Sequence, residues 1–389
     1  MNDSLQSRPV WMIIPTFYPV IGGTQSQVRR LAQRLIAYGQ PVHVLTSQHS
    51  QFHPDGLPPE DVIDGIPVRR VYSRGVGKFG SLLYMLGGWW YLMRHSRRGI
   101  YHANAVGAAG WLAVAARYLL GGRCLVKMRL GCHGYEENYA SGIARWQLVT
   151  LLRLADRVQV VSSELERMVG NMGVQVDRVV RIPNAVDTAV YCPASVEEKT
   201  AMRTRLGLPL HNTILLWVGR LDPIKGLDVL LRAWALLKQH MRETALLVLV
   251  GDGPERDKLL ALMKRLGVAE TVRMVGAQGS VREYYWAADI FVLPSRSEGL
   301  SGALVEAMAC GLPVIASNVG GALDVIQEGK NGTLFGLEDC KQLAQELATM
   351  IAMPVRWAEM GAQARETVKA YAELDVVVQQ LHDLYRQLD

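Results

Sequence analysis

The sequence has few cysteines and no long hydrophobic run. Its 5 cysteines among 389 residues form no Cys-x-x-Cys pair and no spacing typical of a metal site. Their odd number suits a reducing compartment, so we interpret them as small buried side chains. No stretch of about 18 uncharged apolar residues occurs, and the longest candidates, 82–93 and 103–116, are too short to span a bilayer. These absences argue against a disulfide-stapled chain and against a membrane-spanning helix.

Targeting and low-complexity features are also lacking. The first residues carry no apolar segment behind a basic start, so we expect no secretory signal and a cytoplasmic protein. No short-period repeat is visible. With 49% hydrophobic and 20% charged residues, the composition is that of a globular chain.

Charge is distributed unevenly between the two halves. Residues 1–200 contain 22 Lys and Arg against 14 Asp and Glu, whereas residues 201–389 contain 20 against 22. The basic first half predicts an anionic partner: a phospholipid surface, a phosphate-bearing ligand or nucleic acid. Nucleic acid ranks last, because the sequence shows no nucleic-acid-binding module and no alternation of aromatic and basic residues.

Short apolar segments alternate with helical patterns along the chain. A run at 10–14 precedes a helical pattern from Thr24 and a second strand at 42–46, which is the building block of a parallel doubly wound sheet. A strand pair is expected to turn at Asp64-Gly65. Further strands are predicted at 100–103, 123–128, 157–161, 178–182, 214–219, 245–250, 271–275, 289–293 and 313–316. Helices are predicted at 82–97, 107–120, 143–154, 226–240, 255–266, 280–287, 302–310, 355–372 and 373–389.

This alternation predicts an α/β protein with two Rossmann-like doubly wound domains. Periodicity is lost at 188–212, a stretch with two prolines, where we place the linker. The predicted domains are 1–190 and 191–370, with a C-terminal helix, 371–389, that packs back on the first domain. Ligands of such sheets bind at the carboxyl ends of the strands, so we expect both domains to face a deep interdomain cleft.

Two charged residues follow the strand that ends near Gly219. Arg220 and Lys225 lie in the segment WVGRLDPIKG, just before a predicted helix. A diphosphate needs cations and unpaired backbone N–H groups, and a helix N-terminus supplies the latter. Alone, such a pair would more often be two solvated surface charges.

Two carboxylates follow a later strand, in PSRSEGLSGALVEAMACGLPVIAS. Glu298 lies in a glycine-containing loop, and Glu306 lies about one turn into the next helix. Glu306 can accept two hydrogen bonds from a ribose diol, and Glu298 can do the same for sugar hydroxyls. The backbone N–H groups of Leu300, Ser301 and Gly302 come at the start of the helix, where an anion is favoured.

These motifs resemble the retaining glycosyltransferases of family four, which have the GT-B fold. The resemblance rests on GRLDPIKG at 219–226 and on Glu298 followed eight positions later by Glu306. It extends over nearly the whole chain through PTFYPVIGGTQSQV, IPNAVD, LVLVGDGPE and SNVGGALDVIQEGKNGTLF, in the family's order.

The resemblance implies a role for each site residue. Arg220 and Lys225 would neutralise the departing diphosphate of a nucleotide-sugar donor, Glu306 would hold its ribose, and Glu298 would contact the transferred sugar. Further donor contacts are implied for Gly22 and Gly23 of the N-terminal loop and for Gly299, Leu300, Ser301 and Gly302. No cofactor and no metal is expected, since no Asp-x-Asp triplet occurs.

The acceptor side departs from the family's usual pattern. Where members often carry a catalytic histidine, either His102 or Asn104 occupies the position in YHANAVGAAG. Gln25, Ala185 and Asp324 stand where Glu, Gly and Glu are usual. Arg129 and His133 are weaker candidates for a phosphate contact, because a structural role suits them as well.

Residues 82–98, LLYMLGGWWYLMRHSRR, combine aromatic residues with Arg94, Arg97 and Arg98. They fit an amphipathic helix on an anionic membrane, where a lipid-linked acceptor would wait, and equally a buried helix with a basic end.

We therefore interpret the chain as a hexosyltransferase that makes cell-surface polysaccharide, lipopolysaccharide or another glycoconjugate from a carbohydrate or lipid-linked acceptor. Alternatives are a nucleotide-sugar epimerase or hydrolase and a non-catalytic nucleotide-sugar-binding protein. A dinucleotide oxidoreductase ranks below these, since neither half opens with a Gly-x-Gly-x-x-Gly fingerprint.

Overall fold

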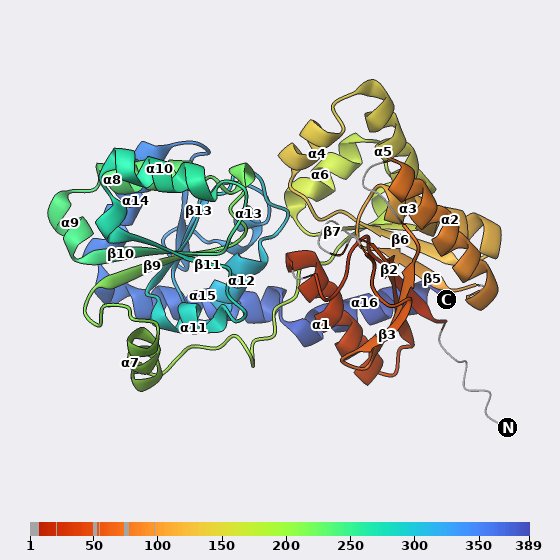
Figure 1. Cartoon of the computed structure of the whole chain (residues 1–389), viewed down its shortest axis with the longest axis horizontal. Helices are drawn as coiled ribbons and strands as arrows, with labels where there is room; N and C mark the ends of the chain where they lie inside the picture. The colour runs from red at the N-terminus through yellow and green to blue at the C-terminus, as the bar shows by residue number, and fades with distance from the viewer. Residues whose placement is uncertain (1–7, 21, 50–52, 54, 74–77, 97) are drawn as a thin grey trace. The chain divides into compact units, whose positions relative to one another are not determined.

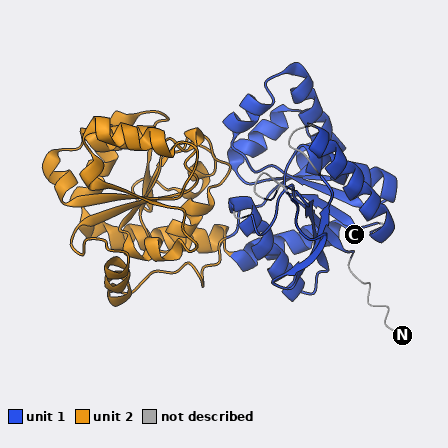
Figure 2. Ribbon diagram, in the orientation of Figure 1, with its two compact units in different colours: residues 1–185, 374–389 blue, residues 186–373 orange. Residues whose placement is uncertain are grey.

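The computed structural model describes residues 8–389 except 21, 50–52, 54, 74–77 and 97, and it contains two compact units (Figures 1 and 2). Unit 1 comprises residues 1–185 and 374–389, and unit 2 comprises residues 186–373. The chain thus passes into unit 2 at Val186 and returns to unit 1 at Leu374. The boundaries drawn from the sequence, 190 and 370, lie a few residues from these crossings.

Unit 1 is built on an eight-stranded sheet with the order β3-β4-β2-β1-β5-β6-β7-β8. Neighbouring strands are parallel except for β3, which pairs antiparallel with β4. Central strands such as β1 and β5 are buried along their whole length, as expected where helices cover both faces of a parallel sheet. The strands are β1 (Val10–Ile13), β2 (Val42–Ser47), β3 (Glu60–Ile63), β4 (Ile66–Val71), β5 (Ile100–Ala103), β6 (Arg123–Lys127), β7 (Arg157–Val160) and β8 (Val179–Arg181).

The predicted turn between β3 and β4 is confirmed. Asp64 and Gly65 both have positive φ angles, 49° and 79°, which is the left-handed pair that a two-residue hairpin requires.

Eight helical segments surround this sheet in the described part of unit 1: α1 (Gly23–Ala37), α2 (Lys78–His95), α3 (Ala108–Leu120), α4 (Cys132–Asn138), α5 (Gly142–Leu154), α6 (Ser163–Asn171), the 3-10 turn η1 (Val176–Arg178) and α16 (Leu374–Leu388). Helix α16 comes from the end of the chain and packs beside α1 (Figure 1). Its apolar residues recur with helical spacing and join the core of unit 1: Leu374, Val377, Val378, Leu381, Leu384, Tyr385 and Leu388.

Unit 2 is built on a six-stranded parallel sheet with the order β11-β10-β9-β12-β13-β14. Its strands are β9 (Thr213–Val218), β10 (Ala245–Val250), β11 (Val272–Gly276), β12 (Ile290–Leu293), β13 (Val314–Ser317) and β14 (Gly332–Phe335). Its helices are α7 (Val196–Arg205), η2 (Pro223–Lys225), α8 (Leu227–Leu236), α9 (Gln239–Glu243), α10 (Arg256–Leu266), η3 (Ala269–Thr271), α11 (Arg282–Ala287), α12 (Gly302–Ala309), α13 (Ala322–Val325), α14 (Cys340–Ala352), η4 (Pro354–Arg356) and α15 (Trp357–Tyr371). Strands β9 and β12 lie side by side, so the loops after them share one edge of the sheet.

Two stretches differ from the prediction. The stretch 188–212, where the linker was placed because periodicity is lost, contains α7, whose first turn is closed by a capping box between Ser195 and Glu198. The single helix expected at 226–240 is two helices, because Leu237 and Lys238 adopt extended backbone conformations between α8 and α9.

Candidate active site

The loop after β9 is shaped by Asp222 at its turn and by Gly226 at its end. Asp222 caps the short turn η2 by accepting a hydrogen bond from the backbone N–H of Ile224, and Gly226 then opens α8 with a φ of +63°. A Cβ atom on Gly226 would lie 2.0 Å from the carbonyl oxygen of Pro294. Only glycine therefore allows this loop to rest directly on the loop after β12.

The loop after β12 is held from its other side by the glycine pair after β13. Gly320 has a φ of +55°, and a Cβ atom there would lie 1.9 Å from the carbonyl oxygen of Glu298. The backbone N–H of Gly321 donates a hydrogen bond to the carbonyl of Gly299 at 2.6 Å. The backbone around Glu298 is thus fixed by close packing against a neighbouring loop.

These two loops bring Lys225 and Glu298 together. The Lys225 ammonium lies 2.6 Å from Oε1 of Glu298, and the Ser295 hydroxyl donates to the same oxygen at 2.8 Å. The side chains of Lys225 and Glu298 are 25% and 11% exposed. Within the part of the chain that the structure describes, Oε2 of Glu298 receives no hydrogen bond, and an ammonium has three donors. Both groups can therefore bind a ligand without giving up their pair.

Arg296 braces the same two loops, and the sequence analysis missed it. Its guanidinium donates to the carbonyl of Pro223 and pairs with Asp228 at 3.0 Å and with Glu338, while its backbone N–H donates to Ile224. Burial alone would raise the pKa of Asp228, but the hydrogen bond and charge of Arg296 outweigh it and lower that pKa. The pKa of Arg296 is raised, chiefly by its hydrogen bond to Asp228. A charged residue in the Pro-Ser-Arg-Ser-Glu-Gly loop was the available signal.

Helix α12 carries Glu306 and begins at the loop of Glu298. Ser301 caps the helix by accepting a hydrogen bond from the backbone N–H of Leu304. A Cβ atom at Gly302 would meet no atom within 4 Å, so the start of the helix is open. The buried Tyr285 of α11 donates to Glu306 at 3.3 Å, and its pKa is raised by burial and by the charge of Glu306. Tyr285 therefore holds the Glu306 carboxylate in position.

Arg220 contacts the rest of the site least. Its side chain is 65% exposed, and its nearest acidic group is Asp222 at 3.8 Å. An exposed guanidinium beside Lys225 in sequence keeps its donors available for an anion. The structure thus places all the predicted residues of unit 2 on the loops and the helix that follow two adjacent strands.

The two residues of unit 1 predicted to contact the donor, Gly22 and Gly23, lie at the start of α1. Gly22 is the N-cap of this helix, without a side-chain cap, and no acidic residue occupies the first turn. A Cβ atom at Gly23 would meet no atom within 4 Å. The guanidinium of Arg129, which follows β6, donates to the Thr24 hydroxyl at 3.0 Å. An open helix start and an exposed cation therefore meet at the carboxyl edge of this sheet.

The structure places His102, a predicted catalytic residue, in the interior of unit 1. Its side chain has no exposed surface, and Nδ1 lies 2.7 Å from the hydroxyl of Tyr385 of α16. Burial, with a contribution from the charge of Lys127, lowers the pKa of His102 to about 3, so the imidazole is neutral. Asn104 is also buried and donates to the carbonyl of His102. Both side chains stabilise the interior of unit 1. His133 is exposed and pairs with Glu137 on α4.

Lys127 is a buried cation at the end of β6. It is 3% exposed, and its ammonium donates to the neutral amide of Asn184 at 3.1 Å. Burial, together with the charge of Arg129, lowers its pKa to about 8.

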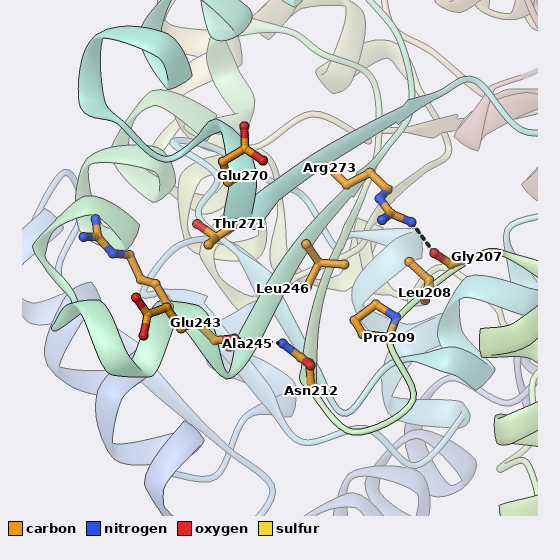
Figure 3. Close-up of a pocket in the computed structure, with 11 residues that line it drawn as sticks. Gly207, Leu208, Pro209, Asn212, Glu243, Ala245, Leu246, Glu270, Thr271 and Arg273 are labelled. Atoms are coloured by element: carbon orange, nitrogen blue, oxygen red, sulfur yellow. Dashed lines mark hydrogen bonds between the residues drawn. The ribbon is translucent and has the colours of Figure 1, made fainter.

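Figure 3 shows a pocket of about 420 Å³ that lies elsewhere in unit 2. Its lining comes from the segments that precede or begin β9, β10 and β11, so it lies at the amino edge of the sheet. Arg273 points across it to the carbonyl of Gly207, and Asn212 donates to the carbonyl of Glu243. The pocket is therefore separate from the site at the carboxyl edge.

The described residues contain no group of three or more His, Cys, Asp or Glu side chains that could hold a metal ion. None of their helices combines the length and the hydropathy needed to cross a bilayer.

Comparison with known proteins places this chain in a family. Residues 198–367 match the family model "Glycosyl transferases group 1", and residues 21–190 match "Glycosyltransferase Family 4". The chain is 32% identical to D-inositol 3-phosphate glycosyltransferase 2 of Catenulispora acidiphila, over 94% of this chain and 93% of that protein. It is 30% identical to D-inositol 3-phosphate glycosyltransferase of Kineococcus radiotolerans, over 90% of this chain and 87% of that protein.

Solved structures show the same fold. Sucrose-phosphate synthase from Thermosynechococcus elongatus matches with a TM-score of 0.87 and 25% identity, over 98% of this chain and 99% of that chain. The Anabaena protein HepE in complex with UDP-glucose matches with a TM-score of 0.82 and 21% identity, over 98% of this chain and 100% of that chain.

The two Rossmann-like units and the family match define a glycosyltransferase with the GT-B fold. The chain belongs to glycosyltransferase family 4.

Proposed function

We propose that this enzyme transfers a hexosyl group from a nucleoside-diphosphate sugar to an acceptor hydroxyl, with retention at the anomeric carbon and without a metal ion. The observation that carries the proposal is the convergence of Lys225 and Glu298, from two loops, at the carboxyl edge of unit 2. Arg220 and Lys225 neutralise the diphosphate as it leaves. Glu298 accepts hydrogen bonds from the sugar through Oε2, and Glu306 accepts them from the ribose.

Retention is consistent with the surroundings of Glu298. Its carboxylate already accepts hydrogen bonds from Lys225 and Ser295, which stabilise its charge and make it a weak nucleophile. A front-face reaction needs no protein nucleophile. The departing diphosphate is stabilised by cations, and the acceptor hydroxyl attacks from the same side through an oxocarbenium-like state.

Uracil is the proposed base of the donor nucleotide. Support comes from the Anabaena relative in fold, which was solved with UDP and with UDP-glucose. Metal independence is supported by the two cations of the loop after β9, which supply the charge that Mg²⁺ supplies elsewhere.

For the acceptor we propose a phosphate-bearing hydroxyl compound on the route to a glycoconjugate or cell-surface polysaccharide. The curated relatives are named for D-inositol 3-phosphate, and Lys127 and Arg129 concentrate positive charge at the carboxyl edge of unit 1. Inositol phosphates and lipid-phosphate-linked sugars share this chemistry. Parallel assays with D-inositol 3-phosphate and with a polyprenyl-diphosphate-linked sugar distinguish the two sources.

The test is a transfer assay with a panel of nucleotide sugars in the presence of excess EDTA. We expect a new anomeric bond with the configuration of the donor and an unchanged rate after chelation. Loss of turnover with EDTA would contradict metal independence, and an inverted product would contradict retention. Release of free sugar, or a second nucleotide sugar, without any acceptor would identify a hydrolase or an epimerase. Tight donor binding without turnover on any acceptor would identify a binding protein.

A further inference from the structure

Helix α2 is apolar on two opposite faces, and only one of them is covered. Its inner face consists of buried residues at four-residue intervals: Gly80, Tyr84, Gly88 and Leu92. The helix packs closely on α3, because a Cβ atom at Gly88 would lie 2.5 Å from the side chain of Leu112. The outer face carries four exposed side chains, which we term the α2 stripe: Phe79, Leu82, Leu86 and Trp90, exposed by 68%, 50%, 55% and 47%. A helix on the surface of a globular protein normally carries polar residues on its outer face, so this stripe needs a partner.

Cationic side chains lie at the C-terminal end of the α2 stripe. The guanidinium of Arg94 lies 4.3 Å from the ring centre of Trp90, which it faces. The backbone N–H of Arg98 donates to the carbonyl of Leu120, so the end of α2 lies beside the end of α3 (Figure 1). There the side chains of Tyr118 and Leu119 are also exposed. Arg97, named with this segment in the sequence analysis, lies outside the described residues.

The charge of this region has one sign. Residues 65–135, which include α2 and α3, contain no Asp or Glu. Among the residues that the structure describes, Arg94 and Arg98 form no ion pair, whereas Arg69 and Arg117 pair with acidic residues outside the segment. Within the described residues of unit 1, the exposed cations at the end of the α2 stripe therefore lack a counter-charge, and an anionic partner would supply it.

We propose that the α2 stripe docks on an anionic phospholipid surface, with α2 lying in the plane of the interface. The four apolar side chains would enter the boundary between headgroups and acyl chains, and Arg94 and Arg98 would contact lipid phosphates. The inference rests on α2 and its surroundings alone and does not require the proposed reaction.

The test is flotation of the full chain with two kinds of vesicle at low salt: phosphatidylcholine alone, and phosphatidylcholine mixed with an equal part of phosphatidylglycerol. We expect binding to the mixed vesicles only. Leu86→Glu should weaken it by at least about tenfold, because a leucine that enters the lipid boundary on docking is replaced by a charge. Arg94→Gln should weaken it about fivefold. Val176→Glu is the matched control, since Val176 is a valine of unit 1 that is 81% exposed. It lies in η1 next to the edge strand β8, whereas α2 packs against β4, near the opposite edge of the sheet.

Three results would overturn the proposal: no binding to mixed vesicles at low salt, equal binding to both vesicles, or equal losses for Leu86→Glu and Val176→Glu. Self-association that Leu86→Glu abolishes, without vesicle binding, would assign the α2 stripe to a second copy of the chain instead. Thermal stabilisation by UDP reports on unit 2 separately. A variant that loses vesicle binding but keeps this stabilisation and its turnover of a water-soluble acceptor separates failure of docking from failure of the proposed function.

Discussion

Lys225 can bind a ligand while it pairs with Glu298. It neutralises Glu298, a carboxylate that is largely withdrawn from water, and two of its three N–H donors remain for a ligand. A diphosphate that enters the site adds negative charge where a cation already stands, so the site is arranged before the donor arrives. This is the arrangement that lowers the barrier for a departing anion without reorganisation.

Removal of Lys225 should therefore damage catalysis more than folding. In Lys225→Ala we expect kcat/KM for transfer to fall by about 10² to 10³, because a preorganised charge at the leaving group is lost. Steady-state kinetics and thermal unfolding measure the two effects. Lys258→Ala is the matched control, because Lys258 is an exposed lysine of unit 2 that pairs with Glu255. Near-native turnover of Lys225→Ala would refute the role.

The burial of Lys127 should make the free energy of unfolding depend on pH. Burial lowers its pKa to about 8 in the folded protein, while the unfolded chain keeps the ordinary value of 10.5. Between these values the unfolded state holds the proton and the folded state does not, so the free energy of unfolding rises with pH. Relative to Lys127→Met, the wild type should gain stability at about 1.4 kcal/mol per pH unit in that window, with no change below it. Urea unfolding of both proteins across this range measures it; a constant difference would show that the lysine titrates normally.

Residue types and strand ends predicted which residues of unit 2 lie close together better than they predicted the surroundings of His102. Lys225, Glu298 and Glu306 follow predicted strand ends, and the register of parallel strands brings such residues to one edge. The burial of His102 could not be predicted, because a strand pattern gives the direction of a side chain but not what covers it. Its cover is Tyr385, which is 283 residues away in sequence and comes from a helix at the other end of the chain.

At the scale of elements, the site is a contact between loops. The turn after β9, the loop after β12 and the glycine pair after β13 touch through backbone atoms, and Arg296 ties two of them. Distances between ligand-binding groups are then set by main-chain packing, which side-chain motion changes little.

Two glycines with the same backbone angle test this contact. Gly226 and Gly207 have φ angles of +63° and +61°, but a Cβ atom would collide with Pro294 at Gly226 and would meet nothing within 4 Å at Gly207. We expect Gly207→Ala to cost about 1–2 kcal/mol from backbone strain alone. Gly226→Ala should cost more and also weaken UDP binding, because the two loops must separate. Thermal unfolding and calorimetric titration with UDP compare the pair; equal effects would mean that the loop contact is dispensable.

Most elements could be predicted because periodicity and strand length agree locally. The predicted strands lie within one residue of the observed ones at each end; 100–103 and 245–250 match β5 and β10 without any shift. Helix α7 was missed because Pro193 and Pro209 flank it and its pattern is mostly polar, with Arg203 as its one buried residue. The burial of that arginine against Asp289 is a tertiary contact, which no local pattern contains.

At the scale of the whole molecule, the chain builds unit 1, then unit 2, and returns to finish unit 1. The last helix supplies buried residues to the core of unit 1, including the partner of His102. The donor-site residues of unit 2 lie on the segment between these two crossings. The charge follows a similar division along the sequence: the first half is basic, and the second half is near neutrality.

The central claim is that unit 2 captures the donor diphosphate with Lys225 and Arg220. The most direct test is a crystal structure of the protein with UDP-glucose, grown without divalent metals. The account predicts phosphate oxygens within hydrogen-bond distance of the Lys225 ammonium and the Arg220 guanidinium, with the ribose hydroxyls on Glu306. A nucleotide bound at the opposite edge of the sheet, in the pocket beside Arg273, or a diphosphate that contacts neither cation, would contradict it.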